Sequence, residues 1–100
     1  MADSVYEIMM YTPLGSKKGM MSCRIKNGII NGQLYILKHS EPFEGVIDED
    51  GNCKIKGKIV TMLKAACYTG IGRITASLVE LKVYYGRGEY ELCGTPLKKN

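Results

Sequence analysis

The segment His39-Ser40-Glu41 contains a base, a hydroxyl and a carboxylate, which are the residue types of hydrolytic catalysis. A catalytic triad works only when these groups converge in space. Along an extended segment, side chains alternate between opposite faces, so we expect Ser40 to point away from His39 and Glu41. The chain has a single histidine. We therefore interpret the segment as a polar loop and predict no catalytic residues and no enzyme.

Two further segments carry part of a ligand-binding pattern. In Asp48-Glu49-Asp50-Gly51-Asn52, acidic side chains alternate as in a calcium loop, but glycine comes at the fourth position instead of the sixth and Ile59 takes the twelfth. In Tyr68-Thr69-Gly70-Ile71-Gly72-Arg73, a phosphate site would need a helix N-terminus after the glycines, whereas the following residues indicate a strand. We interpret the first segment as an acidic hairpin turn, and we predict no metal and no cofactor.

The cysteines Cys23, Cys53, Cys67 and Cys93 are spread almost evenly and form no C-x-x-C pair. This spacing argues against a zinc site. The beginning of the chain lacks the basic region and apolar run of a secretory signal, so we expect a cytoplasmic protein with reduced thiols. Buried cysteine behaves as a small hydrophobic residue, and we interpret the four thiols as strand-filling side chains.

The sharpest electrostatic feature is a row of lysines. In a strand, Lys54, Lys56 and Lys58 share one face at roughly 7 Å spacing, which matches the phosphate spacing of an extended nucleic acid. Arg24 and Lys26 repeat the pattern, and exposed tyrosines such as Tyr35 or Tyr84 could stack on bases. The alternative is an ordinary solvated sheet face, on which Glu80, Glu89 and Glu91 pair with the lysines. We favour the solvated face and keep single-stranded nucleic-acid binding as a weaker alternative.

Length and composition indicate one domain over residues 1–100. A chain of 100 residues forms a single core. Its 45% hydrophobic and 24% charged residues and its net charge of +4 are typical of a soluble globular protein. It has no apolar run near the roughly 18 residues of a membrane helix, so we expect no membrane partner. We expect residues 1–4 and 97–100 to be flexible.

Apolar and polar residues alternate with a period of two along most of the chain, which predicts an all-β protein. Tight turns are indicated by Thr12-Pro13-Leu14-Gly15, Asn27-Gly28, Asp50-Gly51 and Gly86-Arg87-Gly88. The expected antiparallel strands cover residues 5–11, 19–26, 29–38, 43–48, 52–62, 66–76, 77–85 and 89–95. Eight short strands joined mostly by tight turns predict a meander.

The second half of the chain is a faint copy of the first. With a shift of 49 residues, the identical pairs are Thr12/Thr61, Leu14/Leu63, Arg24/Arg73, Ile25/Ile74, Tyr35/Tyr84 and Gly45/Gly94. We interpret this as an internal duplication, with four-strand halves over residues 5–48 and 52–97. Two such halves predict a small closed or nearly closed barrel, with a two-sheet sandwich as the alternative. The strand glycines Gly32, Gly45, Gly57 and Gly72 are expected to curve the sheet.

Some strands are apolar on both faces. Along residues 5–11 and 77–85, hydrophobic side chains occupy the outward positions as well as the inward ones, which requires two apolar surroundings. Methionine, present six times, is common on surfaces that accept apolar partners. We therefore expect a homo-oligomer, a dimer in the first instance. The candidate contact residues are Val5, Met9, Tyr11, Leu78 and Tyr84.

Two functions from different classes follow. The first is a non-enzymatic interaction or structural module that self-associates through an apolar strand face. The second is a carrier of a small apolar ligand, because an eight-stranded barrel can hold one small ligand inside. The candidate pocket residues for the carrier are Ile36, Phe43, Ile47, Ile59, Tyr90 and Arg73. The strands that are apolar on both faces favour the interaction module.

Overall fold

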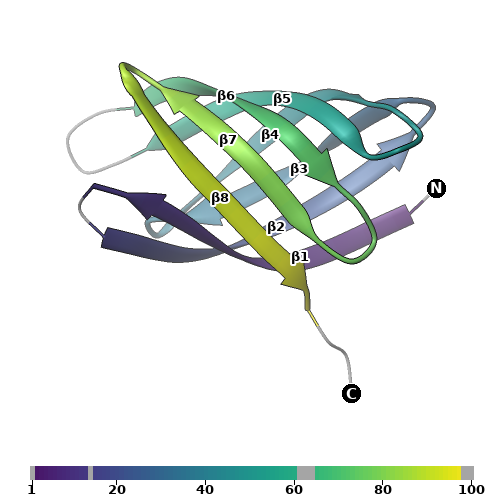
Figure 1. Cartoon of the computed structure of the whole chain (residues 1–100), viewed down its shortest axis with the longest axis horizontal. Helices are drawn as coiled ribbons and strands as arrows, with labels where there is room; N and C mark the ends of the chain where they lie inside the picture. The colour runs from purple at the N-terminus through teal and green to yellow at the C-terminus, as the bar shows by residue number, and fades with distance from the viewer. Residues whose placement is uncertain (1, 14, 61–64, 98–100) are drawn as a thin grey trace.

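The computed structural model describes residues 2–13, 15–60 and 65–97, and these form eight strands (Figure 1). The strand bounds are β1 Ala2–Thr12, β2 Gly15–Lys26, β3 Ile29–Ile36, β4 His39–Ile47, β5 Asn52–Val60, β6 Ala65–Ile74, β7 Val79–Tyr85 and β8 Gly88–Pro96. All-β architecture and eight strands were both predicted from the alternation, and both are confirmed. Leu14, Thr61 and Leu63, which the repeat alignment used, and Met62, the expected end of the fifth strand, lie outside the described part of the chain.

The strands form a closed antiparallel barrel in chain order. Each strand pairs with its neighbours in sequence, and β8 returns to pair with β1 from Tyr6↔Pro96 to Tyr11↔Glu91 (Figure 1). Closure removes the two exposed edges that an open sheet would present. The meander barrel is confirmed, and the two-sheet sandwich is not what the chain forms.

The barrel interior is a packed apolar core. Alternate side chains of every strand point inward, as the period of two requires. Among the described residues no polar or charged residue is buried. The core includes, from β1 to β8 in turn, Ile8, Met21, Leu34, Phe43, Ile55, Tyr68, Val83 and Leu92. Burial of these side chains is the main stabilising contribution.

Glycines allow the strands to bend closely over this core. A Cβ atom on Gly45 would lie 2.0 Å from the Lys54 carbonyl oxygen, and one on Gly32 would lie 1.8 Å from that of Ser22. No side chain fits in that space, so the backbones approach as only glycine allows. The whole barrel is flattened, with extents of 37 × 30 × 18 Å. These contacts support strand curvature as the role of the glycines.

Of two hairpin turns with positive φ angles, one is indicated by its residue types and the other is not. Asn27 and Gly28 have φ angles of 53° and 79°, as expected for the Asn-Gly turn between β2 and β3. The β3–β4 turn uses Leu37 and Lys38 at φ 55° and 67°, a conformation that costs non-glycine residues energy. Sequence reasoning extended the third strand through Lys38 because this turn has no glycine or asparagine.

Three predicted strands begin too late. The structure starts β1 at Ala2, β2 at Gly15 and β4 at His39, several residues before the predicted starts. For β4, residues 39–41 were expected to form a polar loop before a strand beginning at Phe43, whereas the strand begins at His39 and includes Pro42. Pro42 pairs with Gln33 of β3, but pairing with β5 starts only at Phe43. The residue without an amide hydrogen therefore lies where β4 has a neighbour on one side.

The hairpin registers repeat with the same shift of 49 residues as the sequence. Gly19↔Ile36 between β2 and β3 corresponds to Tyr68↔Tyr85 between β6 and β7. Likewise, Ile30↔Gly45 between β3 and β4 corresponds to Val79↔Gly94 between β7 and β8. This geometry is what an internal duplication would produce.

Candidate functional site

The predicted interior pocket residues do not form one site. Ile36, Phe43, Ile47 and Ile59 belong to the packed core, and Tyr90 is partly buried against it. Arg73 instead lies exposed on the outer face of β6, where its Nε donates a hydrogen bond to the Asp50 carbonyl oxygen at 2.9 Å. The four core side chains are part of one buried cluster, and Arg73 does not join it.

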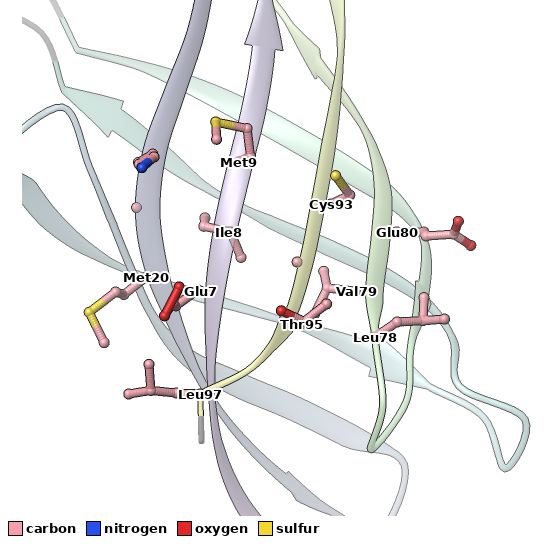
Figure 2. Close-up of a pocket in the computed structure, with 13 residues that line it drawn as sticks. Glu7, Ile8, Met9, Met20, Leu78, Val79, Glu80, Cys93, Thr95 and Leu97 are labelled. Atoms are coloured by element: carbon pink, nitrogen blue, oxygen red, sulfur yellow. The ribbon is translucent and has the colours of Figure 1, made fainter. Parts of the chain in front are cut away.

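An open groove lies on the outer face of the barrel, around the seam between β1 and β8. It has a volume of about 690 Å³ and crosses β2, β1, β8 and the beginning of β7. Figure 2 shows Met20 on one flank and Leu78 on the other, with Met9 toward one end of the groove and Leu97 at the other. Outward positions of a soluble barrel are normally polar. An apolar groove here marks a candidate binding surface.

Strand register explains why these residues meet. On β1, Met9 lies opposite Lys18 of β2 and Cys93 of β8, and Glu7 lies opposite Met20 and Thr95. The C-terminal Leu97 is held beside β1 because its amide donates a hydrogen bond to the Val5 carbonyl oxygen at 2.9 Å. The groove therefore exists only because the barrel closes.

Charged side chains border the apolar residues of the groove. Lys18 lies on the β2 flank, Glu80 on the β7 flank and Glu7 on β1. All three are exposed. The groove thus has a positive β2 flank and a negative β7 flank, and its centre on β1 and β8 contains the apolar Met9 together with the polar Glu7 and Thr95.

Beside the groove, the Cys93 thiol contacts the Tyr11 hydroxyl at 4.0 Å. This contact, together with the electrostatic effect of the same thiol, raises the pKa of Tyr11 above its usual value. Both side chains are exposed. The pair continues the groove along β1 with a less apolar surface.

The predicted self-association residues are only partly brought together. Met9 and Leu78 line the groove. Val5 and Tyr11 are exposed on the same face of β1, to either side of Met9. Tyr84 is 42% exposed on β7 but lies far along that strand, opposite Glu89 of β8.

Met20, Cys93 and Leu97 belong to the groove but were not predicted as contact residues. Met20 could have been found, since it is an apolar residue in an outward position on the strand expected to pair with the first. Leu97 and Cys93 could not, because their place depends on how β8 closes against β1. We had assigned Leu97 to a flexible end.

The predicted basic face lies on the outside of β5, where Lys54, Lys56 and Lys58 are all exposed. Glu44 lies directly opposite Lys56. Glu44 also lies between these lysines and the second basic group, because Arg24 pairs with Asn31 and Asn31 pairs with Glu44. Arg24 and Lys26 therefore do not extend the Lys54 row into one continuous positive surface.

Among the described residues, Glu80, Glu89 and Glu91 do not form the expected ion pairs with Lys54, Lys56 and Lys58, and Glu89 pairs with Lys82 of β7 instead. Glu89 lies 3.9 Å from Lys82, with both side chains about half exposed at 55% and 50%. Such an exposed pair contributes about 0–1 kcal/mol. Glu80 lies opposite Arg73 and Glu91 opposite Lys82. These contacts leave the Lys54 row unpaired by the three glutamates, and the carboxylate that favours a solvated face there is Glu44, opposite Lys56.

The other chemistry-bearing segments have structural roles. Ser40 donates a hydrogen bond to the Gln33 side chain at 3.0 Å, and it lies next to His39 at the start of β4, in a strand and not in the predicted loop. Asp48 accepts hydrogen bonds from the amides of Asp50 and Asn52 at 2.9 and 3.0 Å. Residues 48–52 therefore form an acidic turn, as predicted. Within the described ranges, no group of three His, Cys, Asp or Glu side chains could hold a metal ion.

The cysteines are free, but they do not all fill the barrel. Cys23 and Cys53 are buried and Cys67 and Cys93 are exposed. Desolvation raises the pKa of Cys23 to about 12 and that of Cys53 to about 11. The prediction of strand-filling thiols is therefore right for two of them and wrong for Cys67 and Cys93, which occupy outward strand positions.

Comparison of the chain with protein-family models, with curated proteins and with solved structures finds no match. In the part of the chain that the structure describes, no helix has the length and apolar character needed to cross a membrane.

Proposed function

We propose that this chain is a non-enzymatic interaction module that self-associates through the groove around the β1–β8 seam. One observation carries the proposal: Met9, Met20, Leu78 and Leu97 gather on the outside of a barrel whose inside is already packed. Surface methionines adapt to the shape of apolar partners. A patch that joins four strands differs from the scattered single apolar residues of ordinary surfaces.

The same observation favours an interaction module over a carrier of small apolar ligands. Of the residues expected to line a carrier pocket, Ile36, Phe43, Ile47 and Ile59 belong to the packed core and Arg73 lies on the outer face. The groove, by contrast, is open to solvent and lies on the outer face. A shallow open surface suits a protein partner better than a small molecule, which is usually buried for most of its area.

We also propose a cytoplasmic location. Two exposed free thiols, Cys67 and Cys93, suit a reducing compartment, in which disulfides rarely form.

Sedimentation velocity at tens of micromolar tests the proposal. We expect the mass of a dimer, with dissociation on dilution. A chain that sediments as a monomer throughout that range would overturn it.

A further inference from the structure

Two neighbouring rows of outward residues cross the groove. In each row, the side chains at the two ends are chemically complementary to one another. Lys18 pairs with Met9 of β1, Met9 with Cys93 of β8, and Cys93 with Glu80 of β7. The first row therefore runs from a positive end through two apolar residues to a negative end. The second row begins with Met20, passes through Glu7 and Thr95, and has Leu78 on its far flank. Figure 2 shows Met20 on one side of this row and Leu78 on the other.

We propose that the occupant of the groove is a second copy of this chain, related by a two-fold axis that runs parallel to β1 and β8 and between them. This inference rests on the proposed function and adds the geometry of the partner. A half-turn about such an axis exchanges the two flanks. Lys18 then faces the partner's Glu80, Met20 faces the partner's Leu78, and Met9 faces the partner's Cys93.

Self-complementarity is what a two-fold interface requires, because each contact must occur twice with the roles exchanged. At the ends, both rows meet this requirement, because opposite charges meet in the first and apolar side chains meet in the second. Within the second row, Glu7 faces the partner's Thr95, whose hydroxyl can donate a hydrogen bond to the carboxylate. Had both flanks carried the same charge, the same arrangement would be repelled. The opposite charges of Lys18 and Glu80 are therefore the feature that selects a second copy as the partner.

A stable dimer needs more contact area than the groove residues alone provide. A standard interface buries roughly 800 Å² per partner, which is about one eighth of the 6771 Å² surface of this chain. The groove supplies the centre, and the exposed Val5 and Tyr11 extend it along β1. The flexible side chains of Met9, Met20 and Leu97 from both copies fill the space between the two faces.

A charge-swap experiment tests this geometry. The variants are Lys18→Glu, Glu80→Lys and the double variant, each measured by sedimentation equilibrium beside the unchanged chain. Both side chains are exposed, so the barrel itself should tolerate the changes. The control is the double swap Glu44→Lys with Lys56→Glu, a facing pair on the opposite side of the barrel.

We expect each single variant to weaken dimerisation by roughly tenfold or more, since two like-charge contacts replace two opposite ones. The double variant should recover most of the affinity, and the control swap should leave it unchanged. If the double variant dimerises no better than the weaker single variant, the proposed axis is wrong while self-association stands. If the unchanged chain is monomeric, the proposed function fails as well.

Discussion

Met9 of β1 lies directly opposite Cys93 of β8, across the seam that closes the barrel. The pairing has two consequences. It brings the first and last strands together, so that neither keeps an open edge, and it places both side chains in the apolar groove. The candidate binding surface therefore forms when β8 pairs with β1 and closes the barrel.

A charge in the groove should dissociate the dimer. In Met20→Lys, the new ammonium lies opposite Glu7 within the same chain, so the fold tolerates it, but dimerisation would bury the charge. We expect the dimer dissociation constant to rise at least tenfold in sedimentation equilibrium. The matched control is Ile71→Glu, an exposed position on β6 between Lys54 and Lys82 that does not line the groove. Equal effects of both variants would argue against the groove.

Alkylation should separate the thiols into three groups. Iodoacetamide at about pH 8 reacts with thiolates, so Cys23 and Cys53, whose pKa values are raised to about 12 and 11 by burial, should resist it. Cys67 and Cys93 are exposed and should react in dilute protein. As concentration rises, Cys93 alone should slow, because only Cys93 lies in the groove. Mass spectrometry of peptides gives both rates, and parallel behaviour of Cys67 and Cys93 would count against the proposal.

The strand glycines should be intolerant of even one methyl group where backbones meet. In Gly45→Ala, the Cβ would lie 2.0 Å from the Lys54 carbonyl oxygen and 2.7 Å from the Ile55 Cα. We expect a loss of about 1–3 kcal/mol or more in the free energy of unfolding, measured with urea. Gly70→Ala is the comparison, because its nearest contact is the flexible Ile55 side chain at 3.1 Å. A Gly45 variant as stable as the Gly70 variant would contradict this account of curvature.

Two buried tyrosines should respond oppositely to loss of the hydroxyl. Tyr6 donates a hydrogen bond to the Thr75 carbonyl oxygen at 2.7 Å, so Tyr6→Phe should cost about 1 kcal/mol of stability. The Tyr68 hydroxyl is buried and has no hydrogen-bond partner among the described residues. Tyr68→Phe should therefore be neutral or stabilise by about 1 kcal/mol. Thermal unfolding of the two variants decides the matter, and a large loss for Tyr68→Phe would reveal a partner for its hydroxyl.

Asp48 should stabilise the β4–β5 turn in a pH-dependent way. Desolvation alone would raise its pKa, but hydrogen bonds from the Asn52 side chain and from the backbone of Asn52, Asp50 and Gly51 lower the pKa overall. Because the folded pKa lies below the unfolded one, the stabilisation is present above the unfolded value and is lost as pH falls through the folded value. Asp48→Ala should lower the melting temperature at neutral pH and reduce its fall below about pH 4.

Asp48→Asn is the comparison, because the amide keeps one oxygen acceptor for the turn without the charge. It should be more stable than the alanine variant at neutral pH and show the same reduced acid dependence. A melting temperature that falls below about pH 4 as steeply in both variants as in the unchanged chain would assign that dependence to other carboxylates.

The fold could be predicted further than the site because it depends on local signals. Alternation fixes which side chains face inward, and the Asn27-Gly28 turn is visible as a residue pair. The Leu37-Lys38 turn was missed because nothing in its residue types indicates positive φ angles. Likewise, the beginning of β4 was not predicted, because proline is rare inside strands and the pairing of Pro42 on one side only is a tertiary property.

The groove was predicted only as far as β1. Met9 could be identified from a strand that is apolar on both faces, but Leu97 enters the groove through a hydrogen bond to Val5 at the far end of the chain. Cys93 is brought in by the same closure. In contrast, Arg73 was predicted as a pocket residue, although its strand position points outward. Which outward residues share a surface is decided by register around the whole barrel.

Native mass spectrometry of gently purified protein tests the central claim most directly, because it reads oligomer mass and any bound molecule together. We predict twice the polypeptide mass, with no additional mass released on denaturation, and a shift to the single mass in Met20→Lys. A protomer of single mass would contradict self-association. A protomer with a few hundred extra daltons that denaturation releases would make the protein a carrier instead.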